Sequence, residues 1–251
     1  MPRRLYPTIG FYSQAAVIMG RAGYLATRGR LTSAGLADGS ACLVRALERV
    51  GVRFEVTGLE AVRSHAGPVV FVGNHMSALE TQAMPGLLGR DHPVTFVTKA
   101  SLMKYPVFRD VLGAFDPIVV SRTDPRADLT HVLKEGGRKL EGGTSVIIFP
   151  QAHRSDSFVP EAFGTLGMRL ARRTGVSMVP VALSTGAWGR GTWVEDLGWI
   201  NPALPVRFAF GSPIPVEGDP AEAHRAVVDF IGSHMAAWEA GSVPANGNAK
   251  G

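Results

Sequence analysis

The sequence predicts an α/β fold: a mostly parallel or mixed central sheet flanked by helices, with a membrane-associating helical segment at the N-terminus. Short runs rich in β-branched residues recur along the chain, and helical patterns separate several of them. Hydrophobic residues make up 45% of the 251 residues, which is enough for one sizeable core. The single cysteine, Cys42, excludes a disulfide framework and a multi-cysteine zinc site, so a reducing compartment fits.

Seven apolar runs are expected to form the strands of the sheet. They cover residues 53–57, 69–72, 94–98, 117–120, 145–149, 178–183 and 206–210. In sheets of this kind, chemistry gathers in loops beyond the carboxyl ends of the strands. Those loops are therefore the places to search for a site.

Capping residues and periodicity mark three of the helices. Asp124-Pro125 places a cap and a first-turn proline ahead of a helix running to about residue 140. Apolar residues repeat at helical spacing from 161 to 174, and Gly175 stands where a C-cap belongs. Residues 219–222 resemble a capping box that opens a last helix. Its expected apolar face holds Val227, Phe230, Ile231 and Trp238.

The N-terminal segment has basic residues around an apolar run, Ile9–Met19, that Ser13 and Gln14 interrupt. This run is shorter than the roughly 20 apolar residues that a membrane span needs. Two interpretations remain: a helix packed on the domain, or an amphipathic helix lying on a membrane. In the second, the lipid-facing residues are Phe11, Ile18 and Tyr24, and Arg21 and Arg28 extend to the surface. The expected organisation is a helical segment at 1–50, a main domain at 51–240 and a disordered tail at 241–251.

The net charge of +5 arises mainly from arginine, which provides 21 of the 26 basic residues. These arginines are scattered along the chain, and no helix-turn-helix, zinc-finger or RNA-binding signature accompanies them. We therefore expect no nucleic-acid partner. Anionic head groups at a membrane surface, or phosphorylated small molecules, fit the charge equally well.

His75 follows the second expected strand and precedes a carboxylate, Glu80, by five residues. A carboxylate that holds one imidazole nitrogen leaves the other free to take a proton from a hydroxyl. Five residues turn roughly 140° around a helix axis, so this pair requires His75 in the loop and Glu80 in the first helical turn. A structural alternative stays open, because Ser77 and Glu80 also have the spacing of a capping box.

Two later loops carry basic side chains. Arg122 precedes the helix capped by Asp124, where free amide groups and a guanidinium together suit a phosphate. The alternative is a surface arginine paired with that aspartate. The third loop, residues 150–155, follows the most apolar strand and includes His153 and Arg154. It is expected either to face the first loop across a site or to be a polar turn.

Several known signatures are absent from the sequence. It contains no G-x-S-x-G elbow, no Walker A loop, no G-x-G-x-x-G and no H-E-x-x-H motif. The remaining histidines have no ligand spacing, so no metal site is expected.

Taken together and in order, the loops resemble the glycerolipid acyltransferase family that contains the 1-acylglycerol-3-phosphate acyltransferases. That family carries four blocks: N-H-x-x-x-x-D, a short strand ending in Arg, F-P-E-G-T-R-S, and an apolar V-P block. The matching segments here are residues 74–80, 118–122, 149–155 and 179–181. The stretch from Lys99 to Pro106 also resembles the family's lysine-and-proline segment, and the similarity covers about residues 53–215.

The resemblance implies transfer of a fatty acyl group from acyl-CoA or acyl carrier protein to a hydroxyl of a lysophospholipid or related lipid. His75 would be the general base, oriented by Glu80, with no covalent acyl-enzyme, no metal and no resident cofactor. Arg122 and Arg154 would grip the acceptor's phosphate. The implied substrate-binding residues are Asn74, Lys99, Arg122, Gln151, His153, Arg154, Ser155, Val179 and Pro180. The implied location is peripheral, on the cytoplasmic face of the inner membrane, in phospholipid biosynthesis; no oligomeric state is implied.

This chain departs from the family pattern at four positions. Glu80 replaces an aspartate, Gln151 a glutamate, Ala152 a glycine and His153 a threonine. Three of the four lie in the acceptor block, so the identity of the acceptor is in question more than the reaction. The competing hypothesis is a non-catalytic lipid-binding relative with an altered acceptor site. Retention of both His75 and a carboxylate at position 80 argues against it.

Overall fold

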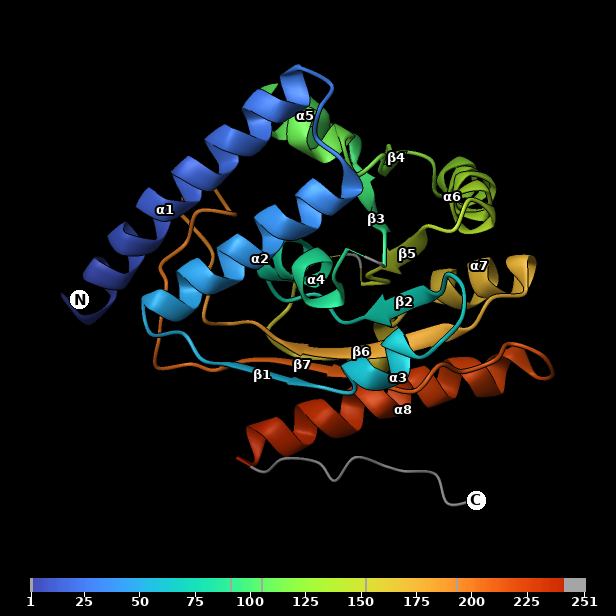
Figure 1. Ribbon diagram of the computed structural model, residues 1–251. Coiled ribbons are helices and arrows are strands. Elements are labelled where there is room, and N and C mark those ends of the chain that lie inside the picture. The colour runs from blue at the N-terminus through green and yellow to red at the C-terminus, as the bar shows by residue number, and fades with distance from the viewer. Residues whose placement is uncertain (1, 91, 105, 152, 193, 242–251) are drawn as a thin grey trace.

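The computed structural model describes residues 2–90, 92–104, 106–151, 153–192 and 194–241 (Figure 1). Ala152 and residues 242–251 of the expected tail lie outside this set. The helices are α1 (Pro2–Thr27), α2 (Ser33–Arg49), α3 (Leu59–Arg63), α4 (Leu79–Leu88), α5 (Pro106–Gly113), α6 (Pro125–Glu141), α7 (Leu166–Thr174) and α8 (Pro220–Glu239). Two 3₁₀ turns, η1 (Ala100–Lys104) and η2 (Pro160–Ala162), accompany them. The strands are β1 (Phe54–Thr57), β2 (Val70–Gly73), β3 (Val94–Lys99), β4 (Ile118–Val120), β5 (Ser145–Ile148), β6 (Met178–Ser184) and β7 (Val206–Phe210).

The seven strands form one mixed sheet in the order β1-β7-β6-β2-β5-β3-β4. Each of the seven strands expected from the sequence is confirmed, with bounds that agree within one residue at either end. Five strands run parallel, while β7 pairs antiparallel with β6, and β1 pairs parallel with β7. The α/β prediction is confirmed, and the antiparallel pair makes the sheet mixed.

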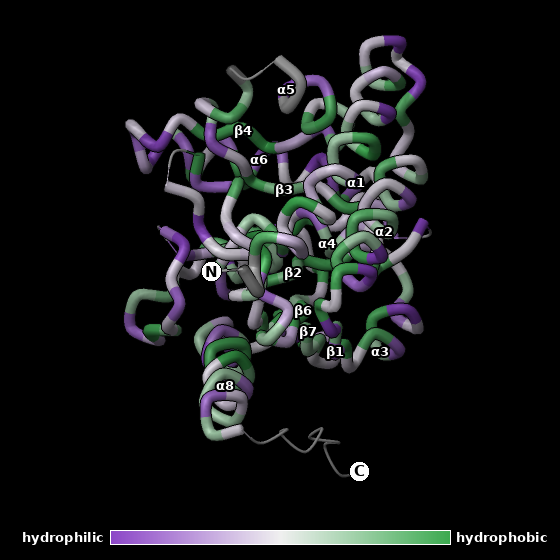
Figure 2. The backbone as a smooth tube through the Cα atoms, turned by 90° about the vertical axis from the view of Figure 1, so that its left-hand side faces the viewer, coloured by the Kyte–Doolittle hydropathy of each residue, from purple (hydrophilic) through white to green (hydrophobic). Residues whose placement is uncertain are grey.

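Helices cover both faces of the sheet. Figure 1 shows α1, α2 and α4 above the sheet and α8 beneath it. Helices α6 and α7 lie to its right, near β5. The tube in Figure 2 is most continuously hydrophobic along the central strands, which lie between these layers. Strands buried on both faces are typical of parallel sheets covered by crossover helices.

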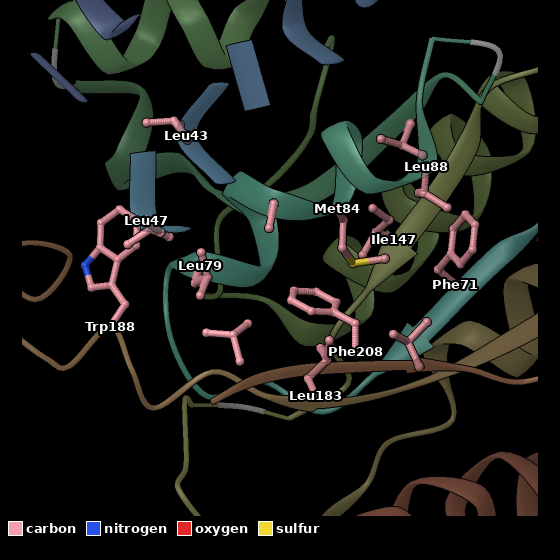
Figure 3. Packing of buried hydrophobic residues seen from close by; sticks show 14 of the residues in the cluster. Leu43, Leu47, Phe71, Leu79, Met84, Leu88, Ile147, Leu183, Trp188 and Phe208 are labelled. Carbon is pink, nitrogen blue, oxygen red and sulfur yellow. The ribbon is translucent and has the colours of Figure 1, made fainter. Parts of the chain in front are cut away.

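Side chains alternate between two cores because successive residues of a strand point to opposite faces. Phe71 of β2 joins Ile147 and Val179 in the cluster beneath α2 and α4, part of which Figure 3 shows. Val70 and Val72 join the other cluster, which α6, α7 and α8 close. Because β2 contributes to both cores from the middle of the sheet, its carboxyl end is rigidly placed.

The caps of α6 and α7 agree with the sequence analysis, but the start of α7 does not. Asp124 caps α6 through the amides of Arg126 and Ala127, and Gly175 ends α7 in the left-handed conformation. The helix expected from residue 161 begins at Leu166 instead. Phe163 is extended and buries its ring in the core, which separates the η2 turn from α7.

Helix α1 packs one face on the domain and exposes the other. Phe11 is completely buried and Ile18 packs against the core, so the expectation that these two residues face lipid is wrong. The physical reason is that the domain offers apolar surface to this side of the helix: Phe11 packs edge-on against Trp188, and Ile18 packs against the same core cluster. Tyr24 is exposed as expected, together with Tyr6, Ile9 and Val17. None of the helices in the described part of the chain has the length and apolar character that crossing a membrane requires.

Glycine permits the close packing around the end of β2. A Cβ atom on Gly73 would lie 3.0 Å from the carbonyl oxygen of Val181 and 3.2 Å from Leu183. The chain therefore leaves the sheet in tight contact with β6. The next two residues, Asn74 and His75, start the loop at the carboxyl edge of the sheet.

Candidate active site

His75 lies in the loop directly after β2, with its backbone held on both sides. Its amide donates to Oε1 of Gln151 at 2.6 Å, and its carbonyl accepts from the amide of Ser155 at 2.9 Å. Its ring stacks on Phe149, with centroids 4.5 Å apart and an interplanar angle of 10°. The loop after β5 thus fixes the position of the imidazole, as the sequence analysis expected of two facing loops.

Glu80 lies in the first turn of α4 and is fully buried. One oxygen, Oε1, accepts hydrogen bonds from the amides of Met76 and Ser77 at 2.7 and 2.8 Å, and from the Thr185 hydroxyl at 2.8 Å. The bond to the Ser77 amide is the contact that a capping box predicts. Ser77 Oγ, however, accepts from the amide of Leu79 rather than that of Glu80. The carboxylate therefore has both a local structural role and a fixed orientation.

The other carboxylate oxygen of Glu80, Oε2, faces the imidazole. It lies 3.8 Å from Nδ1 of His75, and Nδ1 has no hydrogen-bond partner among the described residues. On the other side of the ring, Nε of Arg154 lies 3.4 Å from Nε2. A guanidinium nitrogen only donates, so this contact favours the tautomer with its lone pair on Nε2 and its proton on Nδ1. That tautomer is the one a base at Nε2 requires.

Burial and charge set the protonation of this pair. Burial, followed by the charges of Arg154, Arg122 and Arg190, lowers the pKa of His75 to about 3. Burial also raises the pKa of Glu80, while hydrogen bonds from Ser77, Met76 and Thr185 act in the opposite direction. The imidazole is thus neutral near pH 7, and its Nε2 lone pair, which faces Nε of Arg154, carries no proton.

Arg154 contacts the imidazole, and the charges of Arg122 and Arg190 also act on it. Arg154 pairs through Nη1 with the carboxylate of Asp196, and its carbonyl accepts from Arg190 at 2.5 Å. Arg122 has a left-handed backbone, with φ of 62°, and its amide donates to Asp128 at 2.7 Å. Such a conformation is strained in a residue other than glycine and is typical of functional loops. Arg122 and Arg154 both act on His75 through their charge.

The other residues expected to bind substrate are spread more widely. Both amide atoms of Asn74 bond to the backbone of Leu183, which ties β2 to β6. Val179 and Pro180 are buried within β6, several residues before its carboxyl end. Lys99 and His153 are exposed, and neither contacts His75 or Glu80 among the described interactions. The structure therefore groups His75, Glu80, Gln151, Arg154 and Ser155 in one place.

A groove of about 570 Å³ opens beside the loop that carries His75. The loop contributes Met76 and Ser77 to its wall, and the connection after β6 contributes Gly186 and Trp188. Helix α8 closes the other side with apolar side chains that include Trp238. Its size lies in the usual range for a pocket that binds a small molecule.

Sequence reasoning missed four residues that hold this site together. Thr185 bonds to Glu80, Phe149 stacks on His75, and Asp196 and Arg190 bind Arg154. Thr185 follows β6, so its role depends on β6 lying next to β2. Asp196 and Arg190 lie in the irregular connection between β6 and β7, which carries no motif. Within the described residues, no three His, Cys, Asp or Glu side chains gather where they could hold a metal ion.

Comparison with known proteins gives a consistent result. A family model described as Acyltransferase matches residues 53–184. A 1-acyl-sn-glycerol-3-phosphate acyltransferase from Pseudomonas aeruginosa is 31% identical over 163 residues, which are 64% of this chain and 62% of that protein. The chloroplastic 1-acyl-sn-glycerol-3-phosphate acyltransferase LPAT1 from Arabidopsis thaliana is 29% identical over 131 residues, which are 52% of this chain and 36% of that protein. The matched region therefore spans less than two thirds of either relative.

The fold also matches a solved structure. The crystal structure of the 1-acyl-sn-glycerophosphate (LPA) acyltransferase PlsC from Thermotoga maritima superposes with a TM-score of 0.69. The match covers 95% of this chain and 97% of that protein, at 20% sequence identity. At that identity the likeness concerns the fold.

Proposed function

Because this chain belongs to the acyltransferase family, we propose that it transfers a fatty acyl group from acyl-CoA or acyl carrier protein to a hydroxyl of a lysophospholipid or related lipid. The observation that carries this proposal is the pairing of His75 and Glu80 at the carboxyl end of β2. The carboxylate faces Nδ1 at 3.8 Å, which directs the Nε2 lone pair away from Glu80 and toward the arginines.

The reaction requires one proton to move twice. Nε2 of His75 takes the proton from the acceptor hydroxyl as its oxygen bonds to the thioester carbonyl carbon. The resulting tetrahedral intermediate breaks the carbon–sulfur bond, and the imidazolium returns the proton to the leaving thiolate. The buried carboxylate of Glu80 stabilises the imidazolium between these steps. The products are an ester and a free thiol, so no covalent acyl-enzyme is needed.

An anionic acceptor fits the charges around the base. Without substrate, three guanidinium groups disfavour a proton on His75. A phosphate bound between Arg122 and Arg154 offsets those charges and raises the proton affinity of the imidazole. We infer that the base becomes strongest when an acceptor bearing a phosphate occupies the site.

The groove beside His75 is our candidate site for the acyl chain of the donor. Its wall is largely apolar, and it runs from Met76 of the catalytic loop to Trp238 of α8. Gly186 offers a way to shorten it, because an added Cβ would lie 3.7 Å from the nearest atom, on Leu204. Gly186→Val should reduce kcat/KM for a sixteen-carbon acyl-CoA about tenfold relative to an eight-carbon one. Gly39→Val, on α2 with open space around its Cβ, is the control. An equal effect on both chain lengths would move the acyl chain elsewhere.

We also propose that α1 lies on a membrane surface. Tyr6, Ile9, Val17 and Tyr24 share one face of the helix, and Tyr6 and Val17 are 78% and 73% exposed. Leu197 and Trp199 are also exposed, and they flank Gly198, which accepts a hydrogen bond from Tyr12 of α1 at 2.8 Å. Peripheral attachment at the cytoplasmic face of the inner membrane remains our hypothesis for the location.

The membrane proposal is tested better by point substitution than by truncation, since removing α1 would also remove Phe11 from the core. The double variant Ile9→Ser/Val17→Ser should bind vesicles containing phosphatidylglycerol about tenfold more weakly. Ser13→Ala, at an exposed polar position of the same helix, is the control. Unchanged vesicle binding in the double variant would leave α1 as a packed helix only.

The catalytic proposal is tested by thiol release from palmitoyl-CoA, and from a palmitoylated acyl carrier protein, in vesicles that contain lysophosphatidic acid. Mass spectrometry of the lipids identifies the product. His75→Ala should reduce the rate by about 10²–10⁴. The melting temperature should fall only modestly, because the substitution removes one ring that stacks on Phe149. His131→Ala, at an exposed position on α6, is the matched control.

Two outcomes would contradict this proposal. Activity of His75→Ala within a few-fold of the wild type would remove the imidazole from the mechanism. Lysolipid binding by the wild type without any thiol release would support a non-catalytic lipid-binding protein instead.

A further inference from the structure

The connection between β6 and β7, residues 185–205, reaches across the site and holds Arg154 from two sides. The carboxylate of Asp196 pairs with Nη1 of its guanidinium. Arg190 donates to its backbone carbonyl at 2.5 Å. The side chains of Arg154 and Asp196 are only 19% and 24% exposed, so water screens their ion pair less than it screens a surface pair.

Asp196 is itself firmly placed. Its carbonyl accepts a hydrogen bond from the indole nitrogen of Trp188 at 3.0 Å. Trp188 is nearly buried, and its ring packs edge-on against Phe11 of α1 at a centroid distance of 4.9 Å. The position of the carboxylate is thus determined by core packing between α1 and the β6–β7 connection.

This placement decides which nitrogen of Arg154 meets the base. With Nη1 bound to Asp196, Nε of the same guanidinium is directed at Nε2 of His75, 3.4 Å away. Asp196 is the carboxylate that pairs with Arg154 among the described residues. Gln151 instead holds the backbone amide of His75.

We propose that Asp196 is a positioning residue for acceptor binding: it orients the guanidinium of Arg154 beside the catalytic imidazole so that the remaining donors of that guanidinium receive the acceptor's phosphate. The proposal rests on the function proposed above. A guanidinium carries five N–H donors in a planar fork, so one carboxylate leaves room for a second anion. Preorganised side chains bind an anion more tightly because less freedom is lost on binding.

Asp196→Asn tests this proposal, because asparagine keeps the shape of the side chain and removes its charge. The KM for lysophosphatidic acid should rise about tenfold, the size expected when a hydrogen bond between charged groups is lost. The kcat and the hydrolysis of acyl-CoA by water should change little, since water needs no anion site. Asp196→Glu should recover part of the loss. Glu195→Gln makes the same charge change at the adjacent exposed residue and should leave the KM unchanged.

Three further variants test how Asp196 acts. Arg154→Gln alone should weaken acceptor binding, and adding Asp196→Asn to it should cause no further loss. Trp188→Phe keeps an aromatic ring against Phe11 but lacks the indole donor, so it should raise the same KM by a smaller factor. A further loss in the double variant would overturn the proposal.

The outcomes separate this proposal from the proposed function. An unchanged or lowered KM for lysophosphatidic acid in Asp196→Asn would overturn the positioning role, and a lowered KM would show that Asp196 competes with the phosphate. If His75→Ala is inactive while Asp196→Asn behaves as the wild type, the general-base chemistry stands and only the positioning role fails. If His75→Ala is fully active, the proposed function itself fails.

Discussion

The loop after β2 and the loop after β4 both follow parallel strands, yet the structure holds them very differently. In the first, Glu80 is fully buried, and its oxygens accept from two backbone amides and from Thr185. In the second, Arg122 and its neighbours are exposed, and a partly buried carboxylate at the surface, Asp128, accepts from the amides of Ser121 and Arg122. One loop is built into the core, and the other lies on its surface.

The two loops correspond to two tasks in the proposed function. The buried loop holds the general base, and the surface loop contributes to the choice of acceptor. A base and its orienting carboxylate act only in one geometry, so a buried and fully bonded loop suits them. A side chain that binds an anionic head group tolerates more variation, because charge acts over distance. The departures from the family pattern do not follow this separation of tasks, because Gln151 holds the amide of His75 and Glu80 faces its ring, while His153 is exposed.

Glu80→Gln changes the hydrogen bonding of the buried loop and should have the largest effect on activity. The amide oxygen can still accept from the backbone of Met76 and Ser77. The amide nitrogen then faces Nδ1 of His75 and favours the wrong tautomer, with the proton on Nε2. We expect the rate of thiol release to fall about 100-fold.

Melting temperature separates the two roles of Glu80. The variant should melt close to the wild type, because the lost bonds from Ser77 to Oε2 are offset by removal of a buried charge. Normal activity with a lower melting temperature would leave Glu80 as a capping residue only.

Arg154→Lys and Arg122→Lys compare the acceptor loops directly. Lysine keeps the charge but loses the planar fork, so both variants should raise the KM for lysophosphatidic acid. We expect about tenfold for Arg154, which has a fixed partner, and about threefold for the exposed Arg122. The KM for an uncharged monoacylglycerol is the reference measurement. Equal small changes for both lipids would remove the phosphate-binding role from these residues.

The depressed pKa of His75 predicts an acid sensitivity located in the buried loop. The histidine titrates near 6.5 when unfolded and at about 3 when folded, so the unfolded state binds more protons between these values. Stability is therefore lost as pH falls below about 6.5, by about 1.4 kcal/mol per pH unit at most. His75→Asn should flatten this part of the curve in denaturant unfolding at pH 7, 6 and 5. Parallel curves for variant and wild type would argue against a depressed pKa.

Asp128→Asn tests the surface loop and should have the smallest effect. Backbone hydrogen bonds from Ser121, followed by those from Arg122, hold the pKa of Asp128 below its usual range. Because Asp128 lies at the protein surface and is only partly buried, its loss should raise the acceptor KM by no more than about threefold. Steady-state kinetics with lysophosphatidic acid measures this, with Asp229→Asn on α8 as the control. A loss of activity as large as that of Glu80→Gln would contradict the proposed difference between the two loops.

The sequence by itself determined the fold class, the seven strands and the caps of α6 and α7. These features depend on local patterns: β-branched runs, the Asp124-Pro125 pair and the left-handed Gly175. The order of motifs likewise predicted that His75 lies in a loop and Glu80 in a first helical turn, and the structure places both there. The side-chain roles of this pair stay predictions.

The tertiary structure alone determined which face of a helix is buried and which distant side chains contact one another. Periodicity identified α1 as apolar but could not tell that Phe11 faces the core, because lipid and protein interiors select the same side chains. Thr185 reaches Glu80 from 105 residues away, and Asp196 reaches Arg154 from 42 residues away. Such contacts arise only when β6 packs beside β2 and the β6–β7 connection folds over the carboxyl edge of the sheet. No local pattern in the sequence encodes that packing.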